Sequence, residues 1–200
     1  MLSNWFNRKK QAAVPAQSPA PVATTHDPYE FMSNDAARDA MLKAVLEDDL
    51  GTVKSIARHQ PDCARWVIEA KGSSIGGEPI RTPLTFYPAG AGHVRVLQWL
   101  IDNGAELEAR SNLLNHTALY HAAQRGQIES VRVLLAAGAD AHTRAEVVTP
   151  HTAVQVARQG GFEDVAQLIE SEQQRAQSVA SMAIRDGRIL SAPRLDFRKP

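Results

Sequence analysis

Two histidines, a tyrosine and an aspartate lie close together in the middle of the chain, and their side chains could support catalysis or metal binding. They are His116, Tyr120, His121 and Asp140. Imidazole and carboxylate groups transfer protons or bind a metal ion when they converge within hydrogen-bonding or coordination distance. Whether they converge depends on the elements that carry them, so the surrounding sequence pattern has to be considered first.

The segment that contains these residues recurs along the chain at a fixed period of 35 residues. The copies read TPLTFYPAGAGHVRVLQWLIDNG at 82–104, TALYHAAQRGQIESVRVLLAAG at 117–138 and TAVQVARQGGFEDVAQLIE at 152–170. Each begins with threonine, passes through small residues to a glycine and continues with apolar residues at helical spacing. A period of this length predicts stacked units, each made of two helices joined by a turn.

Particular residues are expected to shape each unit. Gly126 and Gly161 suit the left-handed turn between the two helices. A degraded fourth copy, AMLKAVLEDDLGTVKSIARHQPD, precedes the others, and Asp48 stands in it where a glycine is expected. Threonine hydroxyls can cap the first helix of a unit, and the expected caps are Thr82, Thr117 and Thr152.

These motifs together resemble the ankyrin repeat. The matching stretches are TPL at 82–84, TALYHAA at 117–123, and GAE and GAD after the second helices. The resemblance covers about residues 36–170 and implies an all-α solenoid of about four repeats. The histidine of the family's T-P-L-H motif is replaced by Thr85, Tyr120 and Gln155.

Composition and periodicity divide the chain into further segments. A glycine-rich stretch, GSSIGG, lies within an insertion of about ten residues and is expected to form a hairpin or a mobile loop. The insertion is either tolerated without a role or used to bind a partner. The predicted organisation is a disordered Ala/Pro-rich tail at 1–27, a degenerate repeat at 28–64, an inserted loop at 65–81, three repeats at 82–170, a cap helix at 171–187 that covers the end of the stack, and a basic tail at 188–200.

The repeat pattern argues against a catalytic or metal site. Equivalent positions of stacked helical units lie about 8–10 Å apart, which is too far for two of them to hold one metal ion. The sequence therefore predicts no catalytic residue, no metal site and no cofactor. Cys63 is the only cysteine, which excludes an internal disulfide, and no basic neighbours activate its thiol.

The resemblance implies a protein partner held by loop tips and by exposed positions of the first helices. An apolar pair at a loop tip would suit the centre of an interface, but it could also pack against neighbouring loops. Trp66 either plugs the first unit or anchors a partner. The predicted partner-binding residues are Arg81, Leu113, Leu114, His116, Gln124, Arg125, Val148 and His151.

The predicted function is thus non-catalytic protein binding, as an adaptor or an inhibitor. One alternative is a dedicated inhibitor or immunity-type protein that occludes a single enzyme or toxin. Another is a membrane-surface tether through the aromatic and basic residues of the segment LSNWFNRKK at 2–10. Because 22 basic residues balance 22 acidic ones, no nucleic-acid partner is expected. Without an apolar span or a secretory signal, the expected state is a cytoplasmic monomer.

Overall fold

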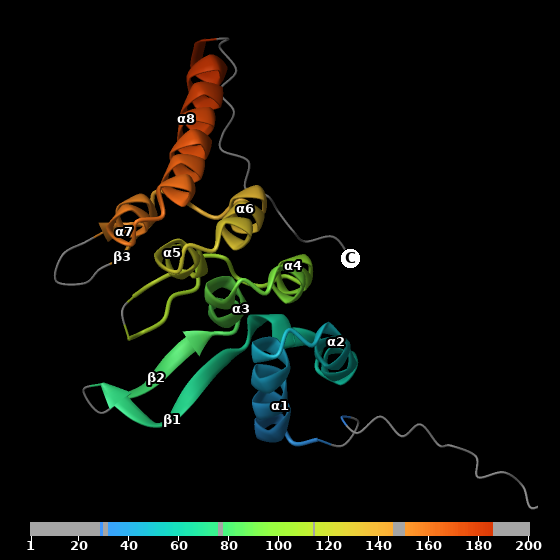
Figure 1. Ribbon diagram of the computed structural model, residues 1–200. Coiled ribbons are helices and arrows are strands. Elements are labelled where there is room, and N and C mark those ends of the chain that lie inside the picture. Colours follow the sequence, from blue (N-terminus) through green and yellow to red (C-terminus); the bar gives the residue numbers. More distant parts are fainter. Residues whose placement is uncertain (1–28, 30–31, 76–77, 114, 146–150, 186–200) are drawn as a thin grey trace, which may run out of the picture.

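The computed structural model describes residues 29, 32–75, 78–113, 115–145 and 151–185, and most of these are helical (Figure 1). Consecutive α-helices form four pairs, as the repeat pattern predicted, and each pair makes up one unit. In chain order, the units are α1 (Asn34–Leu46) with α2 (Leu50–His59), α3 (Phe86–Ala91) with α4 (Val94–Asp102), α5 (Ala118–Gln124) with α6 (Ile128–Ala136), and α7 (Ala153–Gln159) with α8 (Glu163–Arg185). The predicted helical solenoid is confirmed.

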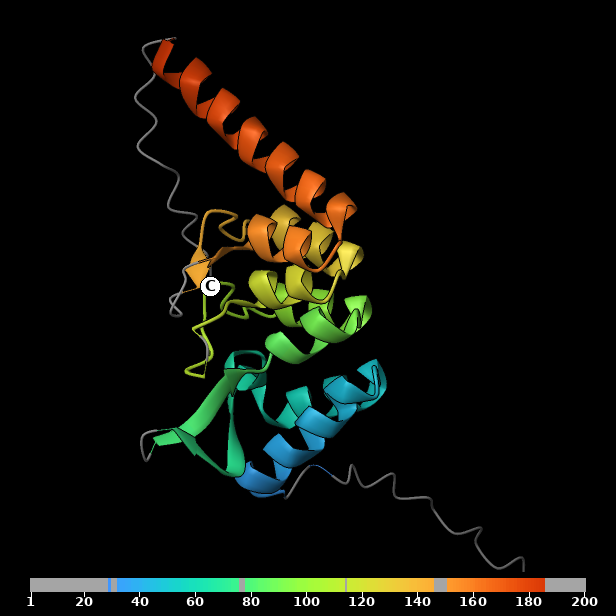
Figure 2. The ribbon, with the colours of Figure 1, turned by 60° about the vertical axis from the view of Figure 1, so that its left-hand side comes forward.

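The units stack side by side in two layers. The first helices, α1, α3, α5 and α7, contact one another in sequence, and the second helices, α2, α4, α6 and α8, form the adjoining layer. Figure 2 shows this order, with the N-terminal helices at one end of the stack and α8 at the other. Apolar residues at helical spacing therefore meet between the two layers and between neighbouring units.

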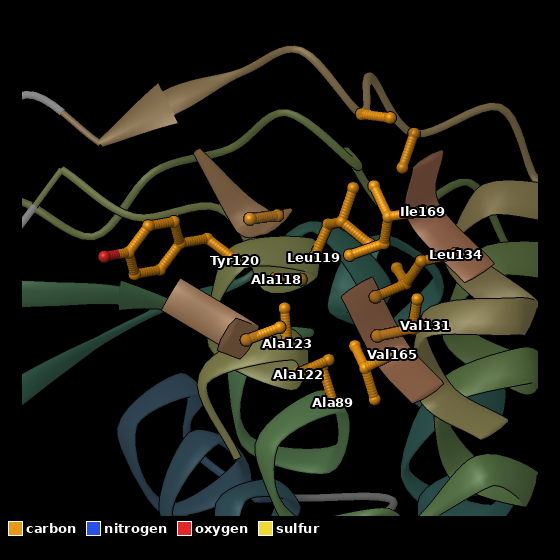
Figure 3. Close-up of a cluster of buried hydrophobic side chains, with 14 of the residues drawn as sticks. Ala89, Ala118, Leu119, Tyr120, Ala122, Ala123, Val131, Leu134, Val165 and Ile169 are labelled. Carbon is orange, nitrogen blue, oxygen red and sulfur yellow. The ribbon is translucent and has the colours of Figure 1, made fainter. Parts of the chain in front are cut away.

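The buried side chains form two clusters, which we call the N-terminal core and the C-terminal core. The N-terminal core contains residues of α1 and α2 together with Val96 and Leu100 of α4. The C-terminal core contains residues of α5 to α8 together with Leu97 of α4. Figure 3 shows part of the C-terminal core, where Leu119 lies near Leu134. Helix α4 contributes to both clusters and joins them.

The turn between the two helices of each unit contains one residue in the left-handed region. Its φ angle is 67° at Gly126 and 79° at Gly161, as predicted for these two glycines. Asp48 occupies the equivalent turn of the first unit with a φ of 54°, and Gly92 that of the second with 78°. Because aspartate tolerates this conformation better than most residues with a Cβ atom, the first unit keeps the turn without a glycine.

Side chains from the following unit lie directly against two of these turns. A Cβ atom at Gly92 would lie 2.5 Å from Oε1 of Gln127, and one at Gly126 would lie 2.4 Å from the ring of Phe162. No described atom lies within 4 Å of the corresponding position at Gly161, which belongs to the last unit. Each covered turn thus depends on its glycine for conformation and also for space.

The predicted insertion is a β-hairpin, one of the two forms expected from its sequence. Strand β1 (Val67–Ile75) pairs with β2 (Glu78–Pro83) in an antiparallel ladder whose register shifts between Glu69 and Ser74. A 3-10 helix, η1 (Pro61–Arg65), leads from α2 into β1. The hairpin extends to one side of the stack (Figure 1), so the fold is mainly helical but not purely α.

The hairpin also changes the start of the second unit. Thr82 was expected to cap the first helix, but it lies in β2, where it pairs with Ile68. Helix α3 begins four residues later, and its N-cap residue, Thr85, makes no side-chain capping hydrogen bond. The predicted cap at Thr82 is therefore wrong, because strand pairing uses the backbone that would otherwise begin the helix.

The C-terminal end of the stack also differs from the prediction. Helix α8 runs without a break from Glu163 to Arg185, so the last unit's second helix and the expected cap helix at 171–187 are one element. Its outer half extends beyond the stack (Figures 1 and 2), and its described side chains from Gln174 to Val179 are exposed. It does not fold over the end of the stack. The predicted tails at 1–27 and 188–200 lie outside the described residues.

Candidate partner-binding surface

The loop from Ala105 to Thr117 carries the exposed leucine of the predicted surface. Leu113 is 46% exposed. Two other predicted residues, Leu114 and Val148, lie outside the described residues. The exposed position of Leu113 fits an apolar contact for a partner.

Asn112 attaches this loop to strand β2 through its backbone and its side chain. The N–H of Asn112 donates to the carbonyl oxygen of Arg81 at 3.1 Å, and the N–H of Arg81 donates to Oδ1 of Asn112 at 2.7 Å. Nδ2 of Asn112 also donates to the carbonyl oxygen of Pro79 at 2.9 Å. Asn112 thus bonds to the backbone of β2 much as a neighbouring strand would. These bonds hold the adjoining Leu113 in place. Asn112 was not among the predicted site residues, although asparagine is a frequent partner of backbone groups in loops.

A second set of hydrogen bonds joins this loop to the next one. Nη1 of Arg110 donates to the carbonyl oxygens of Asn115 at 3.1 Å and Arg144 at 2.9 Å. Glu108 accepts from the N–H of Asp140 at 2.8 Å and from the Thr143 hydroxyl at 3.0 Å. Neighbouring loops therefore contact one another through polar groups. They form a continuous surface along one side of the stack.

The predicted exposure of His116 is wrong. Its side chain is 3% exposed and packs against Tyr120, with ring centroids 4.0 Å apart and planes tilted by 32°. Burial, with a smaller contribution from the charge of His121, lowers the pKa of His116 to about 4. The ring is therefore neutral at neutral pH, and it packs at the start of α5 instead of lying in the rim of an interface, as was expected.

His121 also has a structural environment. Its ring stacks on Phe86 with centroids 3.8 Å apart, and its Nδ1 lies 3.1 Å from the carbonyl oxygen of Phe86. Burial lowers its pKa as well. The ring fits only because residue 90 is glycine, since a Cβ atom there would lie 2.3 Å from it. This histidine thus joins α5 to α3.

Asp140 makes loop contacts that have no catalytic character. Its carboxylate accepts from the N–H of His142 at 2.8 Å and from the hydroxyl of Thr143 at 3.2 Å. These bonds form a local turn after α6, and neither partner is one of the aromatic residues of α5. Within the described residues, no three histidine, cysteine, aspartate or glutamate side chains gather closely enough to hold a metal ion.

The remaining predicted polar residues differ in how far their side chains are exposed. Arg81 forms an exposed ion pair with Glu69 at 3.6 Å, a type of contact that contributes little to stability. Gln124 and Arg125, at the C-terminal end of α5, are exposed. His151 is half-buried in β4 (His151–Thr152), which pairs with β3 (Arg144–Ala145). Four of the predicted residues, Arg81, Leu113, Gln124 and Arg125, are thus exposed.

A cysteine and a tryptophan lie at the base of the hairpin. Cys63 is fully buried, and burial raises the pKa of its thiol to about 11. The thiol therefore stays protonated and is a poor nucleophile. Trp66 is half-buried against the N-terminal core, and the Arg38 guanidinium lies 5.7 Å from the centroid of its ring. This packing supports the interpretation of Trp66 as a plug.

The helix pairs, the left-handed turns and the loops on one side of the stack are those of a class of repeat proteins. Residues 41–145 match the sequence profile of the ankyrin repeats in three copies. Because this match covers more than half of the chain, the chain belongs to the ankyrin-repeat family. The pair α7–α8 lies beyond the match but continues the same stack.

Membership of the family indicates what such repeats generally do. Ankyrin repeats generally act as protein–protein interaction modules and are typically non-catalytic. A comparison with curated proteins finds no match. Among the described residues, no helix combines the length and the apolar character needed to span a bilayer.

Proposed function

We propose that the chain is a non-catalytic binding protein that holds one protein partner through its loop surface and exposed positions on its first helices. The observation that carries the proposal is the exposure of Leu113 on a loop whose backbone is attached to β2. A fixed apolar side chain loses little conformational entropy when a partner covers it, which favours binding.

The other exposed residues of the predicted surface are charged or polar, as in the rim of an interface. Arg81 lies on the strand to which the loop is attached, and Arg125 and Gln124 lie exposed at the end of α5. Arginine is enriched at protein interfaces because its planar guanidinium forms several hydrogen bonds at once. The partner is therefore expected to have an apolar cavity for Leu113 and carboxylates that meet the arginines.

The same surface could serve an adaptor or an inhibitor that occludes one enzyme or toxin. The two roles differ in stoichiometry and lifetime. An inhibitor is expected to form a one-to-one complex that dissociates slowly and abolishes the activity of its target. An adaptor is expected to exchange more rapidly and to leave the partner active. Measuring the dissociation rate and the partner's activity in the complex distinguishes them.

The test begins with affinity purification of the intact chain and identification of the protein retained. Leu113→Ser should then weaken binding of that protein by about tenfold or more, as expected for an anchor residue. The matched control is Val179→Ser on the outer half of α8, because Val179 is 66% exposed and lies outside the surface. Both variants should keep the melting temperature of the original chain.

Two results would contradict the proposal. Undiminished affinity of Leu113→Ser, with Val179→Ser weakened, would place the interface on α8. A lower melting temperature of Leu113→Ser with undiminished affinity would mean that the leucine packs within the chain.

A further inference from the structure

The two edges of the β-hairpin differ in the hydrogen bonds that they make. The N–H of Leu84 donates to the carbonyl oxygen of Trp66 at 2.9 Å, so this pair of residues bonds across the hairpin. Bonded and non-bonded pairs alternate along an antiparallel ladder. The backbone groups of Val67 and Glu69, which alternate with the inward-facing groups of Ile68, must therefore point away from β2.

The outward groups of β2 are already used. Arg81 is opposite Glu69 in the ladder, and both its N–H and its carbonyl oxygen bond to Asn112. Within the described part of the chain, no hydrogen bond is formed by the outward N–H and C=O groups of Val67 and Glu69. The edge of β1 is thus open, whereas the edge of β2 is covered.

We propose that the open edge of β1 at Val67–Glu69 binds an extended basic segment of a partner protein by strand addition. The segment would add a third strand to the hairpin and bond to the backbone of these two residues. This site lies on the opposite edge of the hairpin from the loop that carries Leu113. It is independent of the function proposed above.

The side chains of β1 define the chemistry of the segment. Val67 is 40% exposed, and Glu69 is exposed on the same face, two residues further along the strand. Ile68 is 7% exposed on the other face and anchors the strand to the N-terminal core. Directly opposed side chains interact across strands, so an apolar residue is expected opposite Val67 and a lysine or arginine opposite Glu69.

Charges around the edge also favour a basic segment. Figures 1 and 2 both place β1 between β2 and α1, so the added strand would run beside α1. Asp35 is exposed on α1 one helical turn before Arg38, whose guanidinium lies over Trp66 next to the edge. Residues 28–187 hold 20 acidic and 15 basic residues. A cationic segment would therefore approach an acidic body.

A second copy of the chain fits the edge less well. The register shift begins after Glu69, so the regular edge offers only Val67 and Glu69. Antiparallel pairing of two such edges would place Glu69 opposite either Val67 or Glu69 of the other copy. Neither arrangement supplies a cation opposite Glu69, and the second brings two carboxylates together. The charge and the register shift thus oppose self-association while leaving the edge available.

The test uses the full chain and a blocked synthetic peptide, Thr-Val-Thr-Lys-Thr-Val-Thr-Lys-Thr, as the probe. One face of this peptide alternates valine and lysine, to match Val67 and Glu69. A control peptide has glutamate in place of both lysines. Backbone amide exchange is followed by NMR. In the free chain, the outward amides of Val67 and Glu69 should exchange rapidly while that of Ile68 is protected. The lysine peptide should protect the two outward amides, and the glutamate peptide should bind about tenfold more weakly.

Variants separate the hydrogen bonds from the charge. Val67→Pro removes an outward donor, and the φ of −64° and ψ of 142° at Trp66 allow a proline to follow. It should weaken peptide binding about fivefold relative to Val67→Ala, which keeps the N–H. Glu69→Gln keeps every backbone donor and should reduce the preference for the lysine peptide. Leu113→Ser should leave peptide binding unchanged, which separates this site from the loop surface.

Two outcomes would overturn the proposal. One is that the amides of Val67 and Glu69 still exchange rapidly in a large excess of either peptide, in the original chain and in the Glu69→Gln variant. The other is protection of these amides in the free chain that increases with protein concentration, which would make a second copy the occupant.

Discussion

The second and third units begin with nearly the same sequence but fold differently at their start. In the third unit, the TAL motif begins α5, and the Thr117 hydroxyl accepts from the N–H of Tyr120 at 3.3 Å. In the second unit, Thr82 and Pro83 of the TPL motif belong to β2, and α3 begins only at Phe86. The hairpin that precedes the second unit supplies partners for the backbone of Thr82–Leu84, and these partners replace the helix start.

The second helices of these two units remain alike. Leu100 on α4 and Leu134 on α6 are both fully buried, and a left-handed glycine precedes each helix. The start of a first helix can therefore shift by several residues while the second helix keeps its place. The comparison shows that the stack depends more on the second helices and their turns than on the motif that begins each unit.

The strongest test of this comparison is truncation of the two buried leucines. Leu134→Ala and Leu100→Ala should each lower the free energy of unfolding by about 2–5 kcal/mol, because each leaves a cavity in a packed core. Urea denaturation followed by circular dichroism measures both. If Leu100→Ala lowers the free energy of unfolding much less than Leu134→Ala does, the hairpin has weakened the packing of the second helix of its unit as well.

Substitutions at the glycines of the left-handed turns should lower the free energy of unfolding by less than the leucine truncations do. Gly161→Ala, where no neighbouring atom interferes, should cost about 1 kcal/mol through backbone strain alone. Gly92→Ala should cost slightly more, because the flexible end of Gln127 can move aside. Gly126→Ala should cost about 2–3 kcal/mol, because the ring of Phe162 has to shift as a rigid group.

A second substitution provides the control for the turn series. Adding Phe162→Ala to Gly126→Ala removes the clash, so the pair should couple favourably in a double-mutant cycle. Equal costs at all three glycines, without coupling, would show that only backbone strain matters.

The smallest expected effect concerns the two threonines. Thr117→Ala removes a capping hydrogen bond and should destabilise the chain by about 1 kcal/mol. Thr82→Ala should cost less, because the Thr82 hydroxyl caps no helix; it lies 3.5 Å from the Ser111 hydroxyl and bonds to the side chain of Tyr87, which is half-buried and keeps access to water. Thermal melts of the two variants measure the difference. The same loss in both would mean that Thr82 is as important in the strand as Thr117 is in the helix.

The paired helices and their turns could be predicted from the sequence because each rests on local residues. Helical spacing of apolar residues indicates the second helices, and the glycines indicate the turns. Thr152 was expected as a cap, and it forms a capping box in which Oε1 of Gln155 accepts from the Thr152 N–H at 2.9 Å. Gln155 stands at the position of the family's histidine, and its role in the capping box explains why glutamine is suitable there.

The features that the sequence did not reveal depend on contacts between distant residues. Asn112 bonds to a strand 31 residues away, and no local pattern indicates this partner. His116 directly precedes a predicted cap, as Arg81 does, but only the packing of Tyr120 shows that it is buried. The continuous α8 was divided in the prediction because the repeat pattern ends near residue 170, and the apolar residues that follow were interpreted as the side of a separate cap helix. Nothing in the local sequence shows that these residues extend beyond the stack instead of covering its end.

The shared position of α4 has a consequence for how the chain folds. Val96 and Leu100 belong to one core and Leu97 to the other, so neither core is complete until this nine-residue helix has formed. Repeat arrays can unfold in parts when the contacts between neighbouring units are weak. A helix that joins both cores couples the two halves, so its loss should open both together. We expect α4 to belong to the folding nucleus and to retain the slowest-exchanging amides of the molecule.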